Sequence, residues 1–108
     1  MSERVGRVTF LGTATSHGVP LIGCSCPTCT SDDPRDRRLR PSIYLELADG
    51  TRVLVDTTPD LRLQALTHGI VRVDTILFTH CHADHVMGLD DVRRFNVMQD
   101  ATIPCYGD

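Results

Sequence analysis

The stretch that decides the fold is THCHADH, Thr79–His85, which places three histidines and one aspartate within six positions. It follows directly on TILFT, residues 75–79, an apolar run with the β-branched residues typical of a strand. Alternate residues of a strand project from the same face of the sheet. His80 and His82 should therefore point the same way if the strand geometry persists to the end of this run.

Side chains of this kind are metal ligands. Imidazole and carboxylate groups together suit zinc, manganese or iron, and two such ions can clamp and activate a water between them. We expect His80 and His82 to face one ion, whereas Asp84 and His85 fall where the chain turns toward the next helix and can face a second. Cys81 is expected to point away from the ligands as a small buried thiol. The alternative is a set of polar residues on a surface loop.

Outward from this stretch, short apolar runs alternate with turn signals and two helix-like segments, the pattern of an α/β fold. Strands are predicted over residues 7–11, 43–47, 52–55, 75–79 and 102–106. Asp49-Gly50 lies between the second and third of these runs and predicts a hairpin turn. One helix is predicted to open with Pro59 at its first position and to stop at Gly69, and a second to cover residues 86–95.

A second cluster of metal-binding type lies earlier in the chain, in the segment GCSCPTC. Cys24, Cys26 and Cys29 are spaced to place three thiolates around a tight loop, one ligand short of the four that structural zinc normally takes. The chain has five cysteines, an odd number, which favours metal binding or burial over a disulfide framework. His17 and His68 are the local candidates for a fourth ligand. A redox pair, or idle buried thiols, is the alternative interpretation.

The composition bounds the remaining possibilities. At 108 residues, with 41% apolar and 23% charged residues, the chain has the size of one small domain. A net charge of −3 gives no general reason to bind nucleic acid or an anionic membrane. No secretory signal and no run of eighteen apolar residues is visible, so we expect a cytoplasmic protein without a membrane partner. The arginine-rich segment DPRDRRLRPS could contact an anionic substrate or partner, or could be a solvated charged loop.

The motif H-x-H-x-D-H after an apolar strand resembles the signature of the metallo-β-lactamase fold hydrolases, and HCHADH matches it at every defined position. Four further segments are similar to successive blocks of the branch that contains the phosphoribosyl cyclic phosphodiesterase: FLGTATSHGVPLIGCSCPTC, DPRDRRLRPSIYLEL, VDTTPDLRLQAL and ILFTHCHADHVMGLDDVRRFN. The resemblance spans nearly the whole chain. It implies that residues 1–108 are the N-terminal half of an αββα sandwich, with a mixed β-sheet and helices on one face.

The resemblance also implies a set of roles. His80 and His82 would hold metal one, Asp84 and His85 would hold metal two, and Asp84 would take a direct part in catalysis. Asp56 matches the aspartate that braces the ligand loop from behind, and a strand-end turn residue is the alternative interpretation. The three clustered cysteines would bind a structural zinc whose fourth ligand, a histidine, comes from later in the family's chain. The remaining catalytic ligands would come from there as well.

The function expected from this resemblance is metal-dependent hydrolysis of a small or cyclic phosphodiester by a hydroxide held between two ions. The two catalytic ions would be zinc, with manganese or iron possible. The protein would also hold one structural zinc ion. Two alternatives stay open. The first is a nuclease of the same fold, which would need a basic surface. The second is a non-catalytic fragment that stays soluble by pairing with another copy, and we expect a homo-oligomer in either case.

Overall fold

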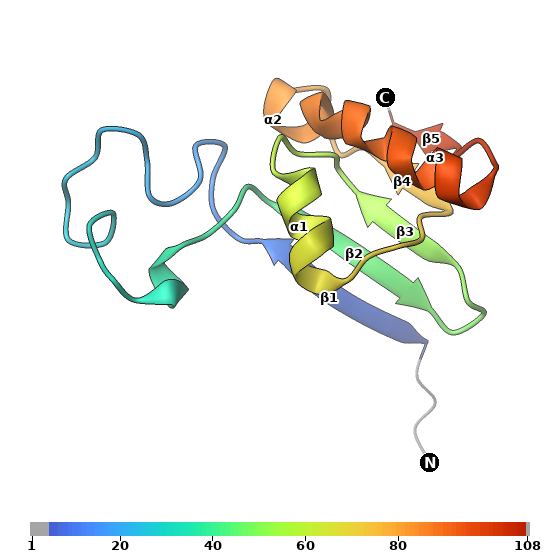
Figure 1. The fold of residues 1–108 in the computed structure, drawn as a ribbon, viewed down its shortest axis with the longest axis horizontal. Coiled ribbons are helices and arrows are strands. Elements are labelled where there is room, and N and C mark those ends of the chain that lie inside the picture. Colours follow the sequence, from blue (N-terminus) through green and yellow to red (C-terminus); the bar gives the residue numbers. More distant parts are fainter. Residues whose placement is uncertain (1–4, 108) are drawn as a thin grey trace, which may run out of the picture.

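The computed structural model describes residues 5–107, which form a five-stranded mixed sheet with helices on one face (Figure 1). The strands lie in sequence order, and they are β1 Gly6–Gly12, β2 Ser42–Leu47, β3 Arg52–Val55, β4 Thr75–Leu77 and β5 Cys105–Tyr106. The first three strands are antiparallel neighbours, whereas β4 pairs parallel with both β3 and β5. The α/β class and the mixed sheet predicted from the sequence are confirmed.

The hairpin between β2 and β3 forms where the Asp49-Gly50 pair predicts it. Gly50 has a φ of +97°, a conformation that costs glycine little because it has no Cβ. Its amide donates to the carbonyl of Leu47 at 3.0 Å and closes the turn. This turn sets the register in which Glu46 faces Arg52 across the two strands.

The first helix, α1, covers Leu61–His68, and its C-terminus is the predicted one. Gly69 takes the left-handed conformation with a φ of 66°, as is common just past the end of a helix. The predicted start is wrong, because Pro59 lies in a turn two residues before the helix begins. The Thr58 hydroxyl accepts from the Asp60 amide at 3.1 Å, so this side chain organises the turn ahead of the helix.

The second predicted helix is wrong as a single element. It is divided into α2 Ala83–Val86, a 3₁₀ segment η2 Met87–Val92, and α3 Arg93–Gln99. The break has a physical reason at Gly88, whose amide donates 3.0 Å to the carbonyl of Thr57. A Cβ on Gly88 would lie 1.8 Å from the carbonyl oxygen of Thr58, so the chain must pass unusually close to the β3–α1 connection.

Two strands are shorter than predicted: β4 ends two residues earlier, and β5 starts three residues later. β4 stops at Leu77, and two residues later the Thr79 amide bonds to the side chain of Asp56 instead of to a neighbouring strand. His80 and His82 therefore belong to a loop, and the strand alternation used to align them does not apply. β5 is limited to two residues, because only Cys105 and Tyr106 pair with β4.

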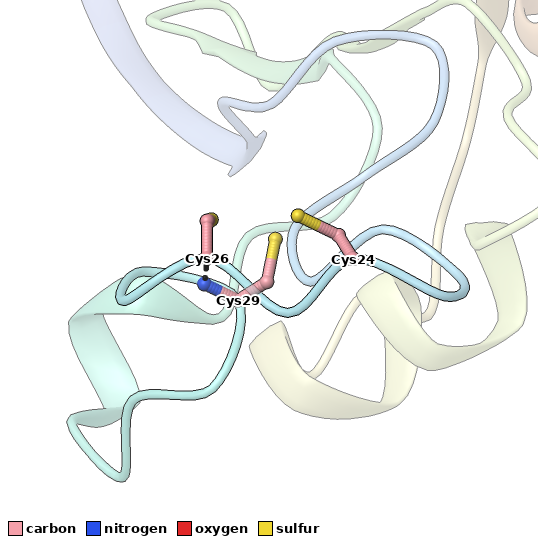
Figure 2. A group of neighbouring side chains, drawn as sticks. All are labelled: Cys24, Cys26 and Cys29. Carbon is pink, nitrogen blue, oxygen red and sulfur yellow. Dashed lines mark hydrogen bonds between the residues drawn. The ribbon is translucent and has the colours of Figure 1, made fainter.

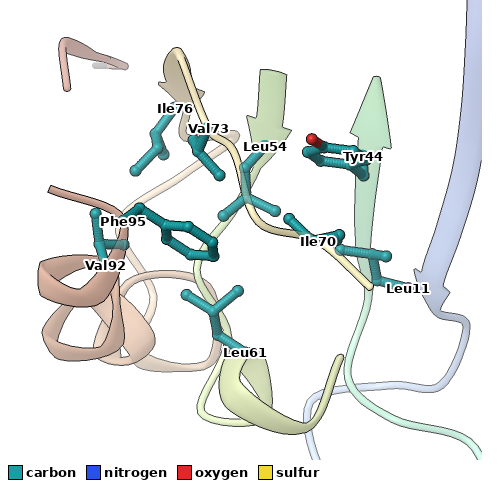
Figure 3. Packing of buried hydrophobic residues seen from close by; sticks show 9 residues of the cluster. All are labelled: Leu11, Tyr44, Leu54, Leu61, Ile70, Val73, Ile76, Val92 and Phe95. Atoms are coloured by element: carbon teal, nitrogen blue, oxygen red, sulfur yellow. The ribbon is translucent and has the colours of Figure 1, made fainter. Parts of the chain in front are cut away.

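The core lies between the sheet and the helices, as Figure 3 shows. Leu54 and Ile76, from the two central strands, are completely buried, and Leu61 of α1 and Phe95 of α3 pack over them. Each such side chain contributes about 1.5–3 kcal/mol through burial. This packing fixes the ends of β3 and β4, from which the candidate ligand loop extends.

The opposite face of the sheet has no helix over it (Figure 1). Its apolar side chains are exposed: Phe10 on β1 keeps 66% of its surface in contact with solvent and Val8 keeps 53%. Leu77 on β4 is also exposed on this side. A contiguous apolar surface of this kind usually marks a face that another polypeptide covers.

Candidate metal centres

Asp56 is the centre of the contacts that hold the loop THCHADH in place. It follows β3, is 3% exposed, and has a φ of 66°, a left-handed conformation that aspartate tolerates better than most residues. Its Oδ1 accepts from the Thr79 amide at 2.8 Å, and its Oδ2 accepts from the Thr79 hydroxyl at 2.8 Å. The same Oδ2 lies 2.6 Å from Nδ1 of His85. One buried carboxylate thus fixes both ends of the loop.

These contacts also determine which nitrogen of each imidazole is left for a metal. The single hydroxyl proton of Thr79 goes to Asp56, so the 2.9 Å contact between Thr79 Oγ1 and His80 Nδ1 requires His80 to donate. The Nδ1 of His85 donates to Asp56 in the same way. Assigned from this network, Nδ1 is the donor in both histidines, which leaves Nε2 as the nitrogen that can bind a metal.

The ring of His80 lies close to the rings of the two other histidines of the loop. The ring centroid of His80 lies 4.5 Å from that of His82 and 4.0 Å from that of His85. His80 and His82 are exposed, whereas His85 retains 12% exposure of its side chain. The structure therefore places His80 beside both other histidines. The sequence prediction had paired it with His82 only.

Asp84 completes the set of candidate ligands. Its Oδ2 lies 2.9 Å from Nε2 of His85, and both residues belong to the short helix α2. Two electron-pair donors at this distance repel each other unless a proton or a cation lies between them. This contact, together with the nitrogen and oxygen donors present, fits a divalent ion of the zinc, manganese or iron type.

Thr79 is a residue of this site that the sequence analysis missed as a participant. It lies just before the first histidine of the motif, and its hydroxyl connects His80 to Asp56. Its position as the first letter of THCHADH was the only available signal. Cys81 was predicted to be buried and is instead exposed, because β4 has already ended and no sheet continues beneath it.

The second candidate centre is the cysteine cluster, in the long loop between β1 and β2. Figure 2 shows the sulfurs of Cys24, Cys26 and Cys29 on the same side of this loop. Their Sγ atoms all lie within 4.8 Å of one another. Among residues 5–107, no other histidine, cysteine or carboxylate joins this group, and neither His17 nor His68 supplies a fourth ligand. The three sulfurs are spaced as ligands of one ion would be.

Backbone amides favour the deprotonated form of one thiol of the cluster, that of Cys26. The Cys29 amide, 3.4 Å from Cys26 Sγ, lowers the pKa of the Cys26 thiol to about 7, and hydrogen bonds from the Cys24 and Cys29 side chains add to this effect. The Leu21 amide acts to lower the pKa of Cys29, but the neighbouring Cys24 and Cys26 side chains and desolvation raise it above its usual value. Thiolates this close together repel one another, and a bound cation would remove this repulsion.

The loop that carries the cysteines is tied to the domain through Arg40. Its guanidinium pairs with Asp60 at 2.9 Å, and the Arg40 amide donates to the same carboxylate at 2.9 Å. The fully buried Gln64 of α1 donates to the Arg40 carbonyl at 2.9 Å. These bonds fix the base of the loop on α1, while its far part extends away from the sheet (Figure 1).

In the part of the chain that the structure describes, no helix is long and apolar enough to cross a membrane.

Comparison with solved structures gives a strong match. A diphosphatase of the PhnP family superposes with a TM-score of 0.87 and 52% sequence identity, over 94% of this chain and 41% of that one. The zinc-bound PqqB of Methylobacterium extorquens superposes with a TM-score of 0.67 over 92% of this chain, and at 23% identity this likeness concerns the fold alone. The helix-backed mixed sheet predicted from the sequence is thus found in solved relatives.

The matches with curated relatives cover most of this chain but only a small part of each relative's length. An octanoyltransferase of Porphyromonas gingivalis is 49% identical over 87 residues, which are 81% of this chain but 18% of that protein. A coenzyme PQQ synthesis protein B of Methylobacterium nodulans is 38% identical over 97 residues, or 32% of its length. This chain therefore spans about a fifth to a third of these relatives.

A family model described as a beta-lactamase superfamily domain matches residues 51–108, or 58 of the 108 residues of the chain. The matched segment includes Asp56 and the whole loop of candidate ligands. It is the segment that the motif H-x-H-x-D-H singled out in the sequence. The chain belongs to the beta-lactamase superfamily, and residues 5–107 form part of the metallo-β-lactamase fold that the sequence predicts.

Proposed function

We propose that this chain carries part of the active site of a metal-dependent hydrolase that cleaves a small or cyclic phosphodiester. One observation carries the proposal. The ring of His80 lies beside those of His82 and His85, Asp84 contacts His85, and the buried Asp56 anchors the group from behind. A surface loop without function has no reason to concentrate these donors around one buried carboxylate.

The residues have distinct roles in this proposal. His80 and His82 would hold one divalent ion, and Asp84 and His85 a second, with Asp84 nearest the reaction. Such ions supply charge neutralisation at the phosphoryl oxygens and lower the pKa of a water. Asp56 keeps both Nε2 atoms available by accepting from His85 directly and from His80 through the Thr79 hydroxyl.

A diphosphate ester is the second candidate substrate. The diphosphatase is 52% identical to this chain over the part that superposes, well above the identity of the other structural neighbour. A diphosphate and a phosphodiester present the same phosphoryl centre to a pair of cations, and they differ in the leaving group. The ligand loop alone does not favour one over the other.

We further propose that these residues work within a larger hydrolase domain. The loop THCHADH offers at most two protein ligands to each ion, whereas catalytic zinc sites usually have three. The diphosphatase neighbour is a longer chain, of which this one covers 41%. Additional ligands from the rest of such a domain would fix the spacing of the two ions.

A hydrolysis assay tests the proposal on the 108-residue chain itself. With zinc or manganese, we expect turnover of a generic phosphodiester or diphosphate ester at least about a hundredfold below that of the diphosphatase neighbour, because misplacement by about 1 Å has this cost. The residual turnover should disappear in the His82→Ala variant and persist in His17→Ala, a histidine outside the loop. Equal rates in the chain and in His82→Ala would refute the role of the loop.

We propose that the cysteine cluster binds a structural zinc ion and has no part in hydrolysis. Its three thiolates suit zinc, and it lies in the β1–β2 loop, in a group separate from the histidines. A zinc ion here would cross-link a long loop that has little secondary structure of its own.

We also propose that the chain self-associates through the apolar face of its sheet. The exposed side chains on this face are Val8, Phe10, Leu47, Leu77 and Tyr106. Sedimentation should show a mass that rises with concentration, and Phe10→Glu should restore a monomer because it places a charge on this face. Leu63→Glu, on the exposed side of α1, is the control and should not. A concentration-independent monomer of the unaltered chain would contradict the proposal.

A further inference from the structure

A cavity of about 440 Å³ lies beside the edge strand β1, between the segment after the 3₁₀ turn η1 (Pro34–Asp36) and the end of α1. Its volume is within the range of small-molecule sites. Six polar residues line it, and they are Thr13, Arg35, Arg37, Arg38, Thr67 and His68. The arginines belong to the segment DPRDRRLRPS, which the proposed hydrolytic function leaves unexplained.

The positive charge of this cavity is not neutralised. Arg35 is paired with Asp33 at 2.7 Å. Arg38 bonds only to neutral groups, the Arg35 carbonyl at 3.1 Å and the Thr13 hydroxyl at 3.3 Å. Arg37 makes no side-chain hydrogen bond or ion pair within residues 5–107, and no carboxylate lines the cavity. Two guanidinium groups therefore remain available, in a chain whose net charge is −3.

A second cavity lined by three arginines differs in this respect. It lies at the other end of the same edge strand. There, however, Glu46 lies inside the cavity, 2.8 Å from Arg7 and 3.7 Å from Arg52, and Arg72 is paired with Asp74 at 3.0 Å. Each of those arginines has a carboxylate partner. Of these two cavities, only the one lined by Arg37 and Arg38 has guanidinium groups without a carboxylate partner among residues 5–107.

The arginines are held in place by their backbone. Arg38 forms an isolated antiparallel bridge with Val19, with both hydrogen bonds at 2.8 Å. The turn η1 is capped by Asp33, whose carboxylate accepts from the Arg35 amide at 2.9 Å. The Thr13 contact then directs the Arg38 guanidinium across the cavity. A preorganised guanidinium loses less freedom when it binds an anion.

We propose that this cavity binds the phosphate group of a small phosphorylated molecule through Arg37 and Arg38, with Thr13 as an additional hydrogen-bonding group. Guanidinium groups bind phosphate oxygens with paired hydrogen bonds, which gives them an advantage over other cations for this anion. The site is distinct from the candidate metal ligands, none of which lines it. The proposed phosphate site is nevertheless next to the histidine loop, because Thr13 also lines a separate cavity that His85 lines.

The experiment is a titration of the zinc-loaded 108-residue chain with inorganic phosphate, followed by ¹⁵N NMR at backbone amides and arginine Nε–H groups. Saturable shifts are expected at Thr13, Arg37 and Arg38. Arg37→Gln and Arg38→Gln should each weaken binding about tenfold, the effect of one hydrogen bond to a charged group. Arg94→Gln is the matched control, because Arg94 is exposed and outside this cavity. It should bind phosphate as the unaltered chain does.

Three outcomes would overturn the proposal. The first is the absence of saturable shifts at these residues. The second is an equal loss of binding in the Arg94→Gln control, which would show general charge screening. The third is shifts confined to His80–His85, which would place phosphate at the metal ligands only. A single-stranded oligonucleotide is titrated in parallel. If the oligonucleotide bound through Arg37 and Arg38 and phosphate did not, the ligand of the cavity would be nucleic acid, and the proposal of a small phosphorylated molecule would be wrong.

Discussion

An Asp56→Ala variant should bind zinc at the histidine loop roughly tenfold to a hundredfold more weakly than the unaltered chain, the usual effect of removing a group that orients metal ligands. Asp56 accepts from the Thr79 amide and hydroxyl and contacts Nδ1 of His85. Without it, both imidazoles are free to rotate and to exchange the proton between their nitrogens. Ion binding would then have to offset the conformational entropy that the loop loses when it becomes ordered.

The same substitution should lower the free energy of unfolding by about 1–3 kcal/mol, because it leaves the donors of Thr79 and His85 without their acceptor. Alanine is also less tolerant than aspartate of the φ of 66° at this position, which adds to the loss. Asp56→Asn separates the two effects, since asparagine keeps the shape and tolerates this conformation. It should recover much of the stability and little of the metal affinity.

Calorimetric titration with zinc and urea unfolding measure both quantities. The control is Asp90→Ala, because Asp90 is 78% exposed in its side chain and pairs only with Arg93 at the surface. Its effect should be within about 1 kcal/mol. If Asp56→Ala matched this control in zinc affinity and stability, the bracing role of Asp56 would be wrong.

The second large effect concerns the cysteine cluster. Replacing Cys24, Cys26 or Cys29 with serine should remove the tightly bound zinc, about one ion per chain, because two thiolates cannot hold a structural ion that needs four ligands. Metal-binding energy in such sites is folding energy, so stability should fall together with zinc content. The loss should be local, because Arg40, Asp60 and Gln64 anchor the base of the loop independently of the cysteines.

Hydrogen exchange resolves where stability is lost. The amides of Cys29 and Thr30, bonded to Cys26 Sγ and to the Cys26 carbonyl, should lose protection in the serine variants, whereas the amides of β2 and β3 should keep it. Cys105→Ser is the matched control, since Cys105 is exposed and lies outside the cluster. Full zinc content and unchanged protection in all three cluster variants would contradict the structural-zinc proposal.

The sequence predicted those features of the fold that depend on local chemistry. The hairpin at Asp49-Gly50 and the helix end at Gly69 both formed as expected, because each needs a positive φ that glycine supplies at little cost. The first three strands were placed to within about one residue for a similar reason, since their β-branched runs are bounded by turn residues.

The features that failed depend on contacts between distant segments. The approach of Gly88 to the Thr58 carbonyl divides the predicted helix 86–95, and no local pattern shows this contact. Asp56 likewise ends β4 by capturing the Thr79 amide. At the candidate site the residue types were readable from the motif, whereas the Thr79 link between His80 and Asp56 required the three-dimensional structure.

The central claim is that the loop binds divalent ions, one through His80 and His82 and a second through Asp84 and His85, and side-chain ¹⁵N NMR of the histidines tests it most directly. The chain is first saturated at the cysteine cluster with one equivalent of zinc, and further zinc is then added. We predict that the Nε2 resonances of these three histidines shift together and saturate, while those of His17 and His68 do not change. No shift up to millimolar zinc, or equal shifts at all five histidines, would contradict the account.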